Sequence, residues 1–559
     1  MKKDAASFVS RWIAAFYKPV KDVWLIWLAL SIVTTLPYML AILRAPTGHR
    51  FSGVLSAYDD TFTYFAWIRQ SADGHLSLRD LFTSEPQPGQ FFLPLWTVIG
   101  FIARVTGWSP ALSFHVVRVF AALVLLIAAR TTALTVMKSR TRVRYTLWVY
   151  AISGGLGWLI YWIKGGGEAV SAASISGSVD LTTPEAIAFR SVFAQVHFVI
   201  GTALLACSIT SLQTAIEQKR ISRAASAGVL VSLLALIHPY MVVVAISVVF
   251  VTFLVYPWLA IGREIRPSLL SRVAVAAAFG AGALPGVAYL LYLNRTSEVL
   301  REWLRVTDTF SPGPQEYLLG FGIIAALAVV GACLCWKSRA NYGRLLLIWA
   351  IVQTALLYAP LSFQRRLVEG LQLPLVLLAS IAVFWIARRF MRGGAERYRK
   401  AWFAAVIAIS SVTNIGFITV QLVSHEDAGS TDSRRYLPVD LMAAFDFMRA
   451  KADTDAVLFS HYLTGNVAPS MTGLRVFLGH YGQTIASDAK GAQVTAFYSG
   501  ELDDAVARQL FERNDVGFVI YGPFERADYV AFVPPRWLRL AKRFGEVDVY
   551  EVERGSRSQ

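Results

Sequence analysis

Two adjacent carboxylates, Asp59 and Asp60, follow the first long apolar stretch of the chain. Keeping an ionisable side chain beside a bilayer costs free energy, so such residues usually serve a function. The run from Tyr58 to Tyr64 contains aromatic residues rather than further charges. We therefore expect the pair to face a polar cleft or partner, where a carboxylate can act as a general base. The alternative is structural, because aspartate also caps helix N-termini well.

A pair of arginines, Arg365 and Arg366, lies in a short polar gap between two apolar segments. A guanidinium group binds phosphate oxygens through two parallel hydrogen bonds. The pair therefore predicts a site for a phosphate or pyrophosphate at the membrane surface. Two other interpretations remain open: the side chains extend to lipid headgroups, or they pair with Glu369.

Four further polar residues lie at the ends of apolar segments and could contact a substrate: His238, Tyr240, Gln195 and His197. A single histidine in such a place is more often structural. Two carboxylates and a histidine could hold a divalent metal ion, but no ligand spacing in the chain is diagnostic. The sequence leaves the need for a metal open.

The composition indicates the class of protein that must position these residues. Of 559 residues, 55% are hydrophobic and 16% are charged, whereas soluble domains carry roughly 25% charged residues. We therefore expect a polytopic α-helical membrane protein. The net charge of +16 comes largely from short basic segments between apolar runs. Such segments orient membrane helices, so the charge does not indicate nucleic-acid binding.

Apolar length and basic loops together predict the topology, since about 20 apolar residues span a bilayer. We predict about eleven spans, near residues 22–43, 112–136, 144–163, 192–215, 225–239, 241–260, 272–293, 317–336, 344–360, 371–388 and 401–422. Residues 91–107 are interpreted as an interfacial helix. The basic segments at 138–144, 219–223, 263–272, 337–344 and 388–400 then lie on the cytoplasmic side. The first outer loop, 44–111, and the tail after residue 423 lie on the opposite side.

The first outer loop contains a pattern that predicts a helix. Phe62, Phe65, Ile68 and Ala72 recur at helical spacing and predict an amphipathic helix at the interface. We divide the chain into a membrane domain, 1–422, and a small extracytoplasmic α/β domain, 423–559.

In the α/β domain we predict strands and helices from short apolar and amphipathic runs. The strands are Ala456–Ser460, Arg475–Leu478, Val516–Tyr521 and Val547–Val552, and the helices are Asp440–Lys451 and Asp503–Arg513. Two polar clusters, Thr464–Asn466 and Gly479–Thr484, are predicted loops. They could bind a sugar or a peptide, although turns need the same residues.

The chain resembles the GT-C superfamily of glycosyltransferases, which includes protein O-mannosyltransferases and bacterial lipid A aminoarabinose transferase. The resemblance rests on the acidic pair Asp59-Asp60, the interfacial helices after it, about eleven spans and a C-terminal domain on the same side. It implies transfer of a sugar from a polyprenyl-phosphate carrier, with a first-loop carboxylate near the acceptor. That role would fall on Asp59 or Asp60. It also implies a bacterial inner-membrane location, whereas the sugar and the lipid, glycan or protein acceptor stay open.

The chemistry of the residues agrees with a transferase that works by an inverting single displacement. A lipid phosphate leaves without protonation and is stabilised by a cation, which Arg365 or Arg366 could supply. The attacking hydroxyl needs a base, a role for Asp59. The alternative is a transporter or flippase for a lipid-linked or anionic substrate, but transporters carry charges near the midplane of the membrane. A polysaccharide polymerase or ligase would also use outer arginines but would lack an obligatory carboxylate in the first loop.

Overall fold

The computed structural model describes residues 2–163, 177–218, 220–259, 268–337, 341–391, 396–423, 434–451 and 455–552. These residues form two compact units. We call Met1–Pro37, Arg118–Leu291 and Thr309–Val423 the membrane unit, and Tyr38–Val117, Tyr292–Asp308 and Ser424–Gln559 the acid-pair unit. The first outer loop and the C-terminal tail thus belong to one unit. Parts of four of the basic segments fall outside the described residues: 219–223, 263–272, 337–344 and 388–400.

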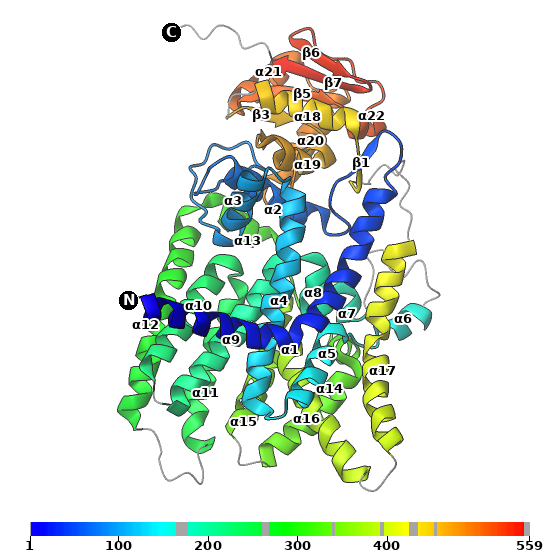
Figure 1. Cartoon of the computed structure of the whole chain (residues 1–559). Coiled ribbons are helices and arrows are strands. Elements are labelled where there is room, and N and C mark those ends of the chain that lie inside the picture. The colour runs from blue at the N-terminus through cyan, green and yellow to red at the C-terminus, as the bar shows by residue number, and fades with distance from the viewer. Residues whose placement is uncertain are drawn as a thin grey trace. The chain divides into compact units, whose positions relative to one another are not determined.

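The membrane unit is built from helices (Figure 1). They are α1 (Lys2–Leu43), α4 (Pro110–Val136), α5 (Arg140–Ile152), α6 (Gly157–Ile163), α7 (Val179–Thr182), η2 (Pro184–Ala186), α8 (Ala188–Ala194), α9 (Val196–Gln218), α10 (Ile221–Ile237), α11 (Tyr240–Leu259), α12 (Leu269–Thr296), α14 (Pro314–Lys337), α15 (Asn341–Leu356), η3 (Gln364–Val368), α16 (Gln372–Phe390) and α17 (Glu396–Val423). Helices α1, α4 and α12 extend at one end into the acid-pair unit.

Among the described residues, seven helical segments are long and apolar enough to cross a membrane. They lie in α1, α4, α9, α12, α14, α16 with the preceding η3, and α17, and each matches a predicted span. The predicted spans at 225–239, 241–260 and 344–360 coincide with shorter apolar helices. The structure therefore confirms a polytopic helical protein, whereas the count of about eleven stays a prediction.

The predicted span at 144–163 is not one continuous helix, because the chain breaks there into α5 and α6. The buried carboxylate of Asp180 accepts hydrogen bonds from the backbone N–H groups of Gly155 at 2.8 Å and Gly157 at 3.2 Å. The N–H group of Gly154 donates to the carbonyl oxygen of Ser410 at 2.6 Å. Because these donors bind outside the local helix, the helical ladder is interrupted at this point.

The acid-pair unit combines helices from the first outer loop with a small α/β fold (Figure 1). Its elements are β1 (His49–Phe51), α2 (Tyr58–Ala72), α3 (Pro94–Thr106), α13 (Glu298–Val306), β2 (Tyr436–Pro438), α18 (Val439–Lys451), β3 (Val457–Phe459), α19 (Tyr462–Thr472), β4 (Arg475–Val476), α20 (Ser487–Tyr498), α21 (Asp504–Arg513), β5 (Val516–Tyr521), α22 (Pro523–Asp528), β6 (Leu538–Phe544) and β7 (Val547–Val552). Helix α3 occupies the segment predicted as an interfacial helix.

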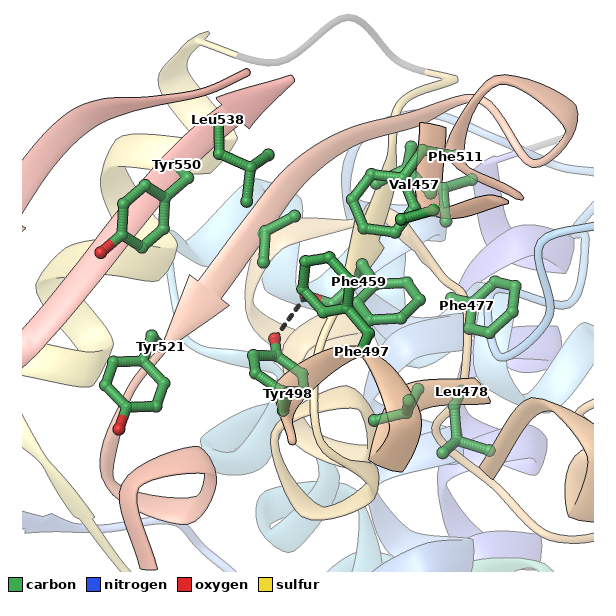
Figure 2. Close-up of a cluster of buried hydrophobic side chains, with 14 of the residues drawn as sticks. Val457, Phe459, Phe477, Leu478, Phe497, Tyr498, Phe511, Tyr521, Leu538 and Tyr550 are labelled. Atoms are coloured by element: carbon green, nitrogen blue, oxygen red, sulfur yellow. Dashed lines mark hydrogen bonds between the residues drawn. The ribbon is translucent and has the colours of Figure 1, made fainter. Parts of the chain in front are cut away.

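A five-stranded sheet has the order β4-β3-β5-β7-β6, in which β3 is parallel to β4 and β5, and β7 is antiparallel to β5 and β6. Each predicted strand and both predicted helices of this region are confirmed. The core beside the sheet is aromatic: Phe459, Phe497 and Phe511 pack together (Figure 2). Tyr498 donates a hydrogen bond from within this core to the carbonyl oxygen of Ile520 at 2.7 Å.

The predicted polar loop Thr464–Asn466 is wrong, because these residues are buried inside α19. Gly465 explains the difference. A Cβ atom at this position would overlap the carbonyl oxygen of Leu478, so glycine allows α19 to pack directly on the segment after β4. The other predicted loop, Gly479–Thr484, is a loop in the structure and follows this close contact.

Candidate active site

The acid pair lies in the first turn of α2. The N-cap position is Ala57, and no side chain caps the helix there, so the capping role considered for Asp59 or Asp60 is wrong. A carboxylate in the first turn is favoured by the partial positive charge at a helix N-terminus. Both carboxylates are thus placed by a regular helix, as the apolar spacing predicted, and the side chains of Phe62, Phe65 and Ile68 are buried.

A short antiparallel pairing brings a distant segment to the acid pair. Strand β1 pairs with β2, with Phe51 opposite Tyr436, and the N–H group of Ser52 donates to the carbonyl oxygen of Arg435 at 2.8 Å. Arg434 immediately precedes this contact. The pairing therefore fixes the start of the described C-terminal segment beside the first outer loop, within one unit.

One oxygen of Asp59 is held by two donors. Arg434 Nη1 donates to Asp59 Oδ1 at 2.7 Å, and the hydroxyl of Tyr462 donates to the same oxygen at 2.9 Å. Arg434 Nη1 also donates to Asn466 Oδ1 at 2.6 Å, and its guanidinium lies 5.2 Å from the ring centre of Tyr58. The Asp59 side chain remains 31% exposed. The contacts therefore fix its orientation without covering it.

Tyr462 keeps its hydroxyl proton in this setting. Burial raises the pKa of Tyr462, and the neighbouring negative charge of Asp59 raises it further. The backbone N–H group of Tyr481 donates to the Tyr462 hydroxyl oxygen at 3.3 Å. The tyrosine thus accepts on one side and donates to Asp59 on the other.

Asp60 faces the buried imidazole of His480. His480 Nδ1 accepts a hydrogen bond from the N–H group of Gly482 at 3.0 Å. Because a backbone amide only donates, Nδ1 carries no hydrogen and the neutral ring is protonated at Nε2. Nε2 lies 3.7 Å from Asp60 Oδ1. The imidazole is fully buried, whereas the Asp60 side chain is 54% exposed.

The loop that carries His480 is bound to the first outer loop. The hydroxyl of Thr484 donates to the carbonyl oxygen of Phe82 at 2.6 Å and accepts from the His480 N–H group at 3.1 Å. Lys490 forms an ion pair with Glu85 at 2.8 Å. Burial lowers the pKa of Lys490, and the bond to Glu85 partly offsets this effect. These contacts hold His480 in place.

Asp80 is a buried acid of the first outer loop with a perturbed pKa. Its Oδ1 accepts a hydrogen bond from the N–H group of Phe82 at 2.8 Å. Its Oδ2 is buried without a hydrogen-bond partner among the described residues. Burial raises the pKa of Asp80 to about 7, although the bond from Phe82 opposes the increase. Asp80 is buried, and its bond from Phe82 supports the loop.

The remaining predicted site residues gather in the membrane unit. The guanidinium of Arg366 lies 4.9 Å from the ring centre of Tyr240. His238 Nδ1 lies 2.6 Å from Glu369 Oε2, and the rings of His238 and His197 are 5.3 Å apart. The structure therefore brings together residues from the ends of α9, α10 and α11 and from η3.

Two other predicted residues, Gln195 and Arg365, are placed by different contacts. Gln195 is buried at the C-terminal end of α8, directly before α9. Arg365 is half-buried, and its backbone N–H group donates to the carbonyl oxygen of Thr309 at 3.0 Å. Its Nε atom is buried and has no hydrogen-bond partner among the described residues. A half-buried guanidinium is suited to bind an anion.

Two atoms in or near the acid pair are already engaged in hydrogen bonds and are unsuited to bind a metal ion. Asp59 Oδ1 already accepts two hydrogen bonds, one of them from a cation. The lone pair of His480 Nδ1 is used by Gly482. In the described part of the chain, no group of three or more His, Cys, Asp or Glu side chains is arranged to hold a metal ion.

Sequence reasoning missed Arg434 and Tyr462. The signal for Arg434 was present, because Arg434-Arg435 is a basic pair on the predicted outer side, as Arg365-Arg366 is. Tyr462 gave no signal, since its role depends on the packing of α19 on α2.

No protein-family model and no curated protein match this sequence. Solved structures do match its fold. The chain aligns with the oligosaccharyltransferase of Archaeoglobus fulgidus, tethered with an acceptor peptide, at 12% identity and a TM-score of 0.52, over 90% of this chain and 69% of that one.

Two other structures match over 94% of this chain. ArnT from Cupriavidus metallidurans, bound to undecaprenyl phosphate, aligns at 11% identity and a TM-score of 0.54, over 97% of its own chain. The arabinofuranosyltransferase AftD from Mycobacteria aligns at 14% identity and a TM-score of 0.51, over 40% of its chain. The protein therefore has the GT-C fold, as the sequence predicted.

Proposed function

We propose that this protein is a membrane glycosyltransferase that moves a sugar from a polyprenyl-phosphate carrier to a lipid, glycan or protein acceptor. The GT-C fold supports the proposal. So do the matched structures, one of which holds undecaprenyl phosphate and another an acceptor peptide. We further propose an inner-membrane location, with the α/β domain 423–559 and the first outer loop outside the cytoplasm.

The observation that carries the proposal is the hydrogen bonding of the Asp59 carboxylate. Its Oδ1 is fixed by Arg434 and Tyr462, while Oδ2 forms no hydrogen bond to a residue that the structure describes. The side chain is partly exposed. A carboxylate with one anchored oxygen and one available oxygen can receive a proton from a bound hydroxyl in a defined direction.

The proposed reaction is a single displacement with inversion. The acceptor hydroxyl transfers its proton to Asp59 while its oxygen forms a bond to the anomeric carbon of the sugar. The bond between that carbon and the carrier phosphate breaks, and its electron pair leaves with the phosphate. Arg365 and Arg366 bind that phosphate and stabilise its negative charge. Asp60 takes part beside Asp59, as the second candidate base.

We also propose four substrate contacts in the membrane unit: His238, Tyr240, His197 and Gln195. The placement of Arg366 over Tyr240 supports a role for Tyr240 in orienting that guanidinium. The contact of His238 with Glu369 supports a fixed orientation for His238.

The function is tested with membranes from a strain that lacks the protein. We expect one polyprenyl-phosphate sugar to accumulate in their lipid extract, as measured by mass spectrometry. Purified protein added in detergent should consume this lipid and release free polyprenyl phosphate. A transporter has no gradient to act on in detergent, so accumulation without consumption would favour the transporter or flippase.

A further inference from the structure

Resting on the proposed transferase function, we propose that Arg434 and Tyr462 are positioning residues for Asp59. They hold Oδ1 so that Oδ2 stays available to the acceptor hydroxyl. Both residues come from the C-terminal segment of the chain. On this account the C-terminal segment is a working part of the catalytic site and not only a separate recognition domain.

The Arg434 side chain is buried and paired. It is only 8% exposed and forms an ion pair with Asp59. A buried guanidinium needs a paired charge, because removing it from water is costly. Asn466, which is fully buried in α19, binds the same Nη1 atom from the other side. Arg434 is thus fixed between α2 and α19.

The hydrogen bond from Tyr462 to Asp59 has a fixed direction. The Tyr481 N–H group occupies a lone pair of the Tyr462 hydroxyl, so the hydroxyl hydrogen is directed to Asp59. Arg434 and Tyr462 both donate to the same carboxylate oxygen, Oδ1, instead of one donating to each oxygen. Two donors on Oδ1 restrict rotation of the carboxylate, and no residue that the structure describes donates to Oδ2.

Regular secondary-structure elements support both donors. Helix α19 runs alongside α2 in the same direction, since Tyr462 meets Asp59 near their N-termini and Arg69 donates to the carbonyl oxygen of Ser470 further along. Arg434 is fixed by the β1–β2 pairing next to it. The two donors therefore reach Asp59 from regular elements with defined positions.

A second ion pair between the same parts of the chain supplies a matched control. Arg449 in α18 binds Asp73 at the C-terminal end of α2 at 2.6 Å, and both side chains are about one third exposed. This pair also ties the C-terminal segment to α2, but it does not involve the acid pair. A general tethering role would make Arg449 and Arg434 equivalent.

The test measures transfer from a polyprenyl-phosphate lipid extract by wild type, Arg434→Ala, Arg434→Lys, Tyr462→Phe and Arg449→Ala. We expect kcat to fall by about tenfold or more in Tyr462→Phe and Arg434→Ala, because each loses a hydrogen bond to a charged group. The KM for the lipid donor should stay unchanged, Lys should restore part of the loss, and Arg449→Ala should match wild type.

A second measurement separates positioning from stability. In an Asp59→Asn background, Arg434→Ala and Tyr462→Phe should cause little further loss, because both act through Asp59. Losses that multiply in that background would overturn the proposal, as would normal kcat in Tyr462→Phe. If Arg434→Ala fails to fold, Tyr462→Phe alone decides. An inactive wild type would refute the transferase function itself, whereas an active wild type with unaffected variants refutes only the positioning role.

Discussion

His480 presents Nε2 to Asp60 Oδ1 across 3.7 Å, with the imidazole buried and the carboxylate exposed. The two residues are far apart in sequence, and the hydrogen bond from Gly482 sets the tautomer that directs an N–H group at the carboxylate. The distance is longer than a hydrogen bond, so a small movement of Asp60 on substrate binding would close it.

We predict that His480→Ala lowers transfer by about tenfold, in the range of a lost hydrogen bond to a charged group. His480→Gln should lose less, because its side-chain amide can place an N–H group near the position of Nε2. The exposed His75, also in the acid-pair unit, supplies the control variant His75→Ala. Equal activity of the Ala and Gln variants at position 480 would contradict a role for this N–H group.

Replacing the arginine pair should distinguish phosphate binding from contact with lipid headgroups. If Arg365 or Arg366 binds the donor phosphate, Lys weakens donor use by about tenfold through loss of the two-bond geometry, and Ala weakens it further. Lys reaches headgroups as well as Arg does, so the alternative predicts normal activity for Lys. The KM for the lipid donor decides between them. Normal activity of the double Ala variant would remove both residues from the site.

Asp80 should make stability depend on pH. Its pKa is about 7 in the folded protein, against an ordinary 3.8, so the folded state holds a proton that the unfolded state releases. The stabilising contribution is complete below about pH 4 and is lost as pH rises through 7. The difference corresponds to about 4 kcal/mol.

The variant Asp80→Asn isolates this effect, since Asn can keep the bond from Phe82 and does not titrate. Between pH 4.5 and 7.5, wild type should lose a few degrees of melting temperature relative to Asp80→Asn. Purified protein in detergent is suitable for the measurement. Parallel curves for the two proteins would show that Asp80 does not hold this proton.

The orientation of the chain is open to a direct test. Reporter fusions after Lys138 and Arg220 should report the cytoplasm, because basic loops remain inside. A fusion after Val552, the last residue of β7, should report the opposite side. A cytoplasmic signal from the last fusion would place the acid pair and the C-terminal segment inside the cell and remove access to an external acceptor.

The sequence predicts the elements whose pattern is local and apolar. Strand β5 is buried and apolar, and its bounds are predicted to the residue, as are those of β7. Strand β6 is missed because it is an edge strand whose charged residues Arg539, Lys542 and Arg543 hide the apolar pattern. The break between α5 and α6 is missed because it depends on Asp180, which is distant in sequence.

The residues of the candidate site also divide into those that a local pattern reveals and those that only distant contacts bring together. The acid pair is visible in the sequence because a charge beside an apolar span is unusual. Its pairing with Arg434 and Tyr462 is not visible, although Arg434 itself stands out as part of a basic pair, because both residues reach Asp59 through the β1–β2 pairing and the packing of α19 on α2. Contacts between such distant segments leave no spacing to detect.

The most direct test of the central claim is sugar transfer by the Asp59→Asn variant. The substitution keeps size and polarity but removes the base, so transfer should fall by about 100-fold or more. The measurement is consumption of the polyprenyl-phosphate sugar by equal amounts of folded protein in detergent, with Asp73→Asn, at the C-cap of the same helix, as the control. We expect transfer to be lost in Asp59→Asn and retained in Asp73→Asn. Wild-type rates in both Asp59→Asn and the Asp59→Asn, Asp60→Asn double variant would contradict it.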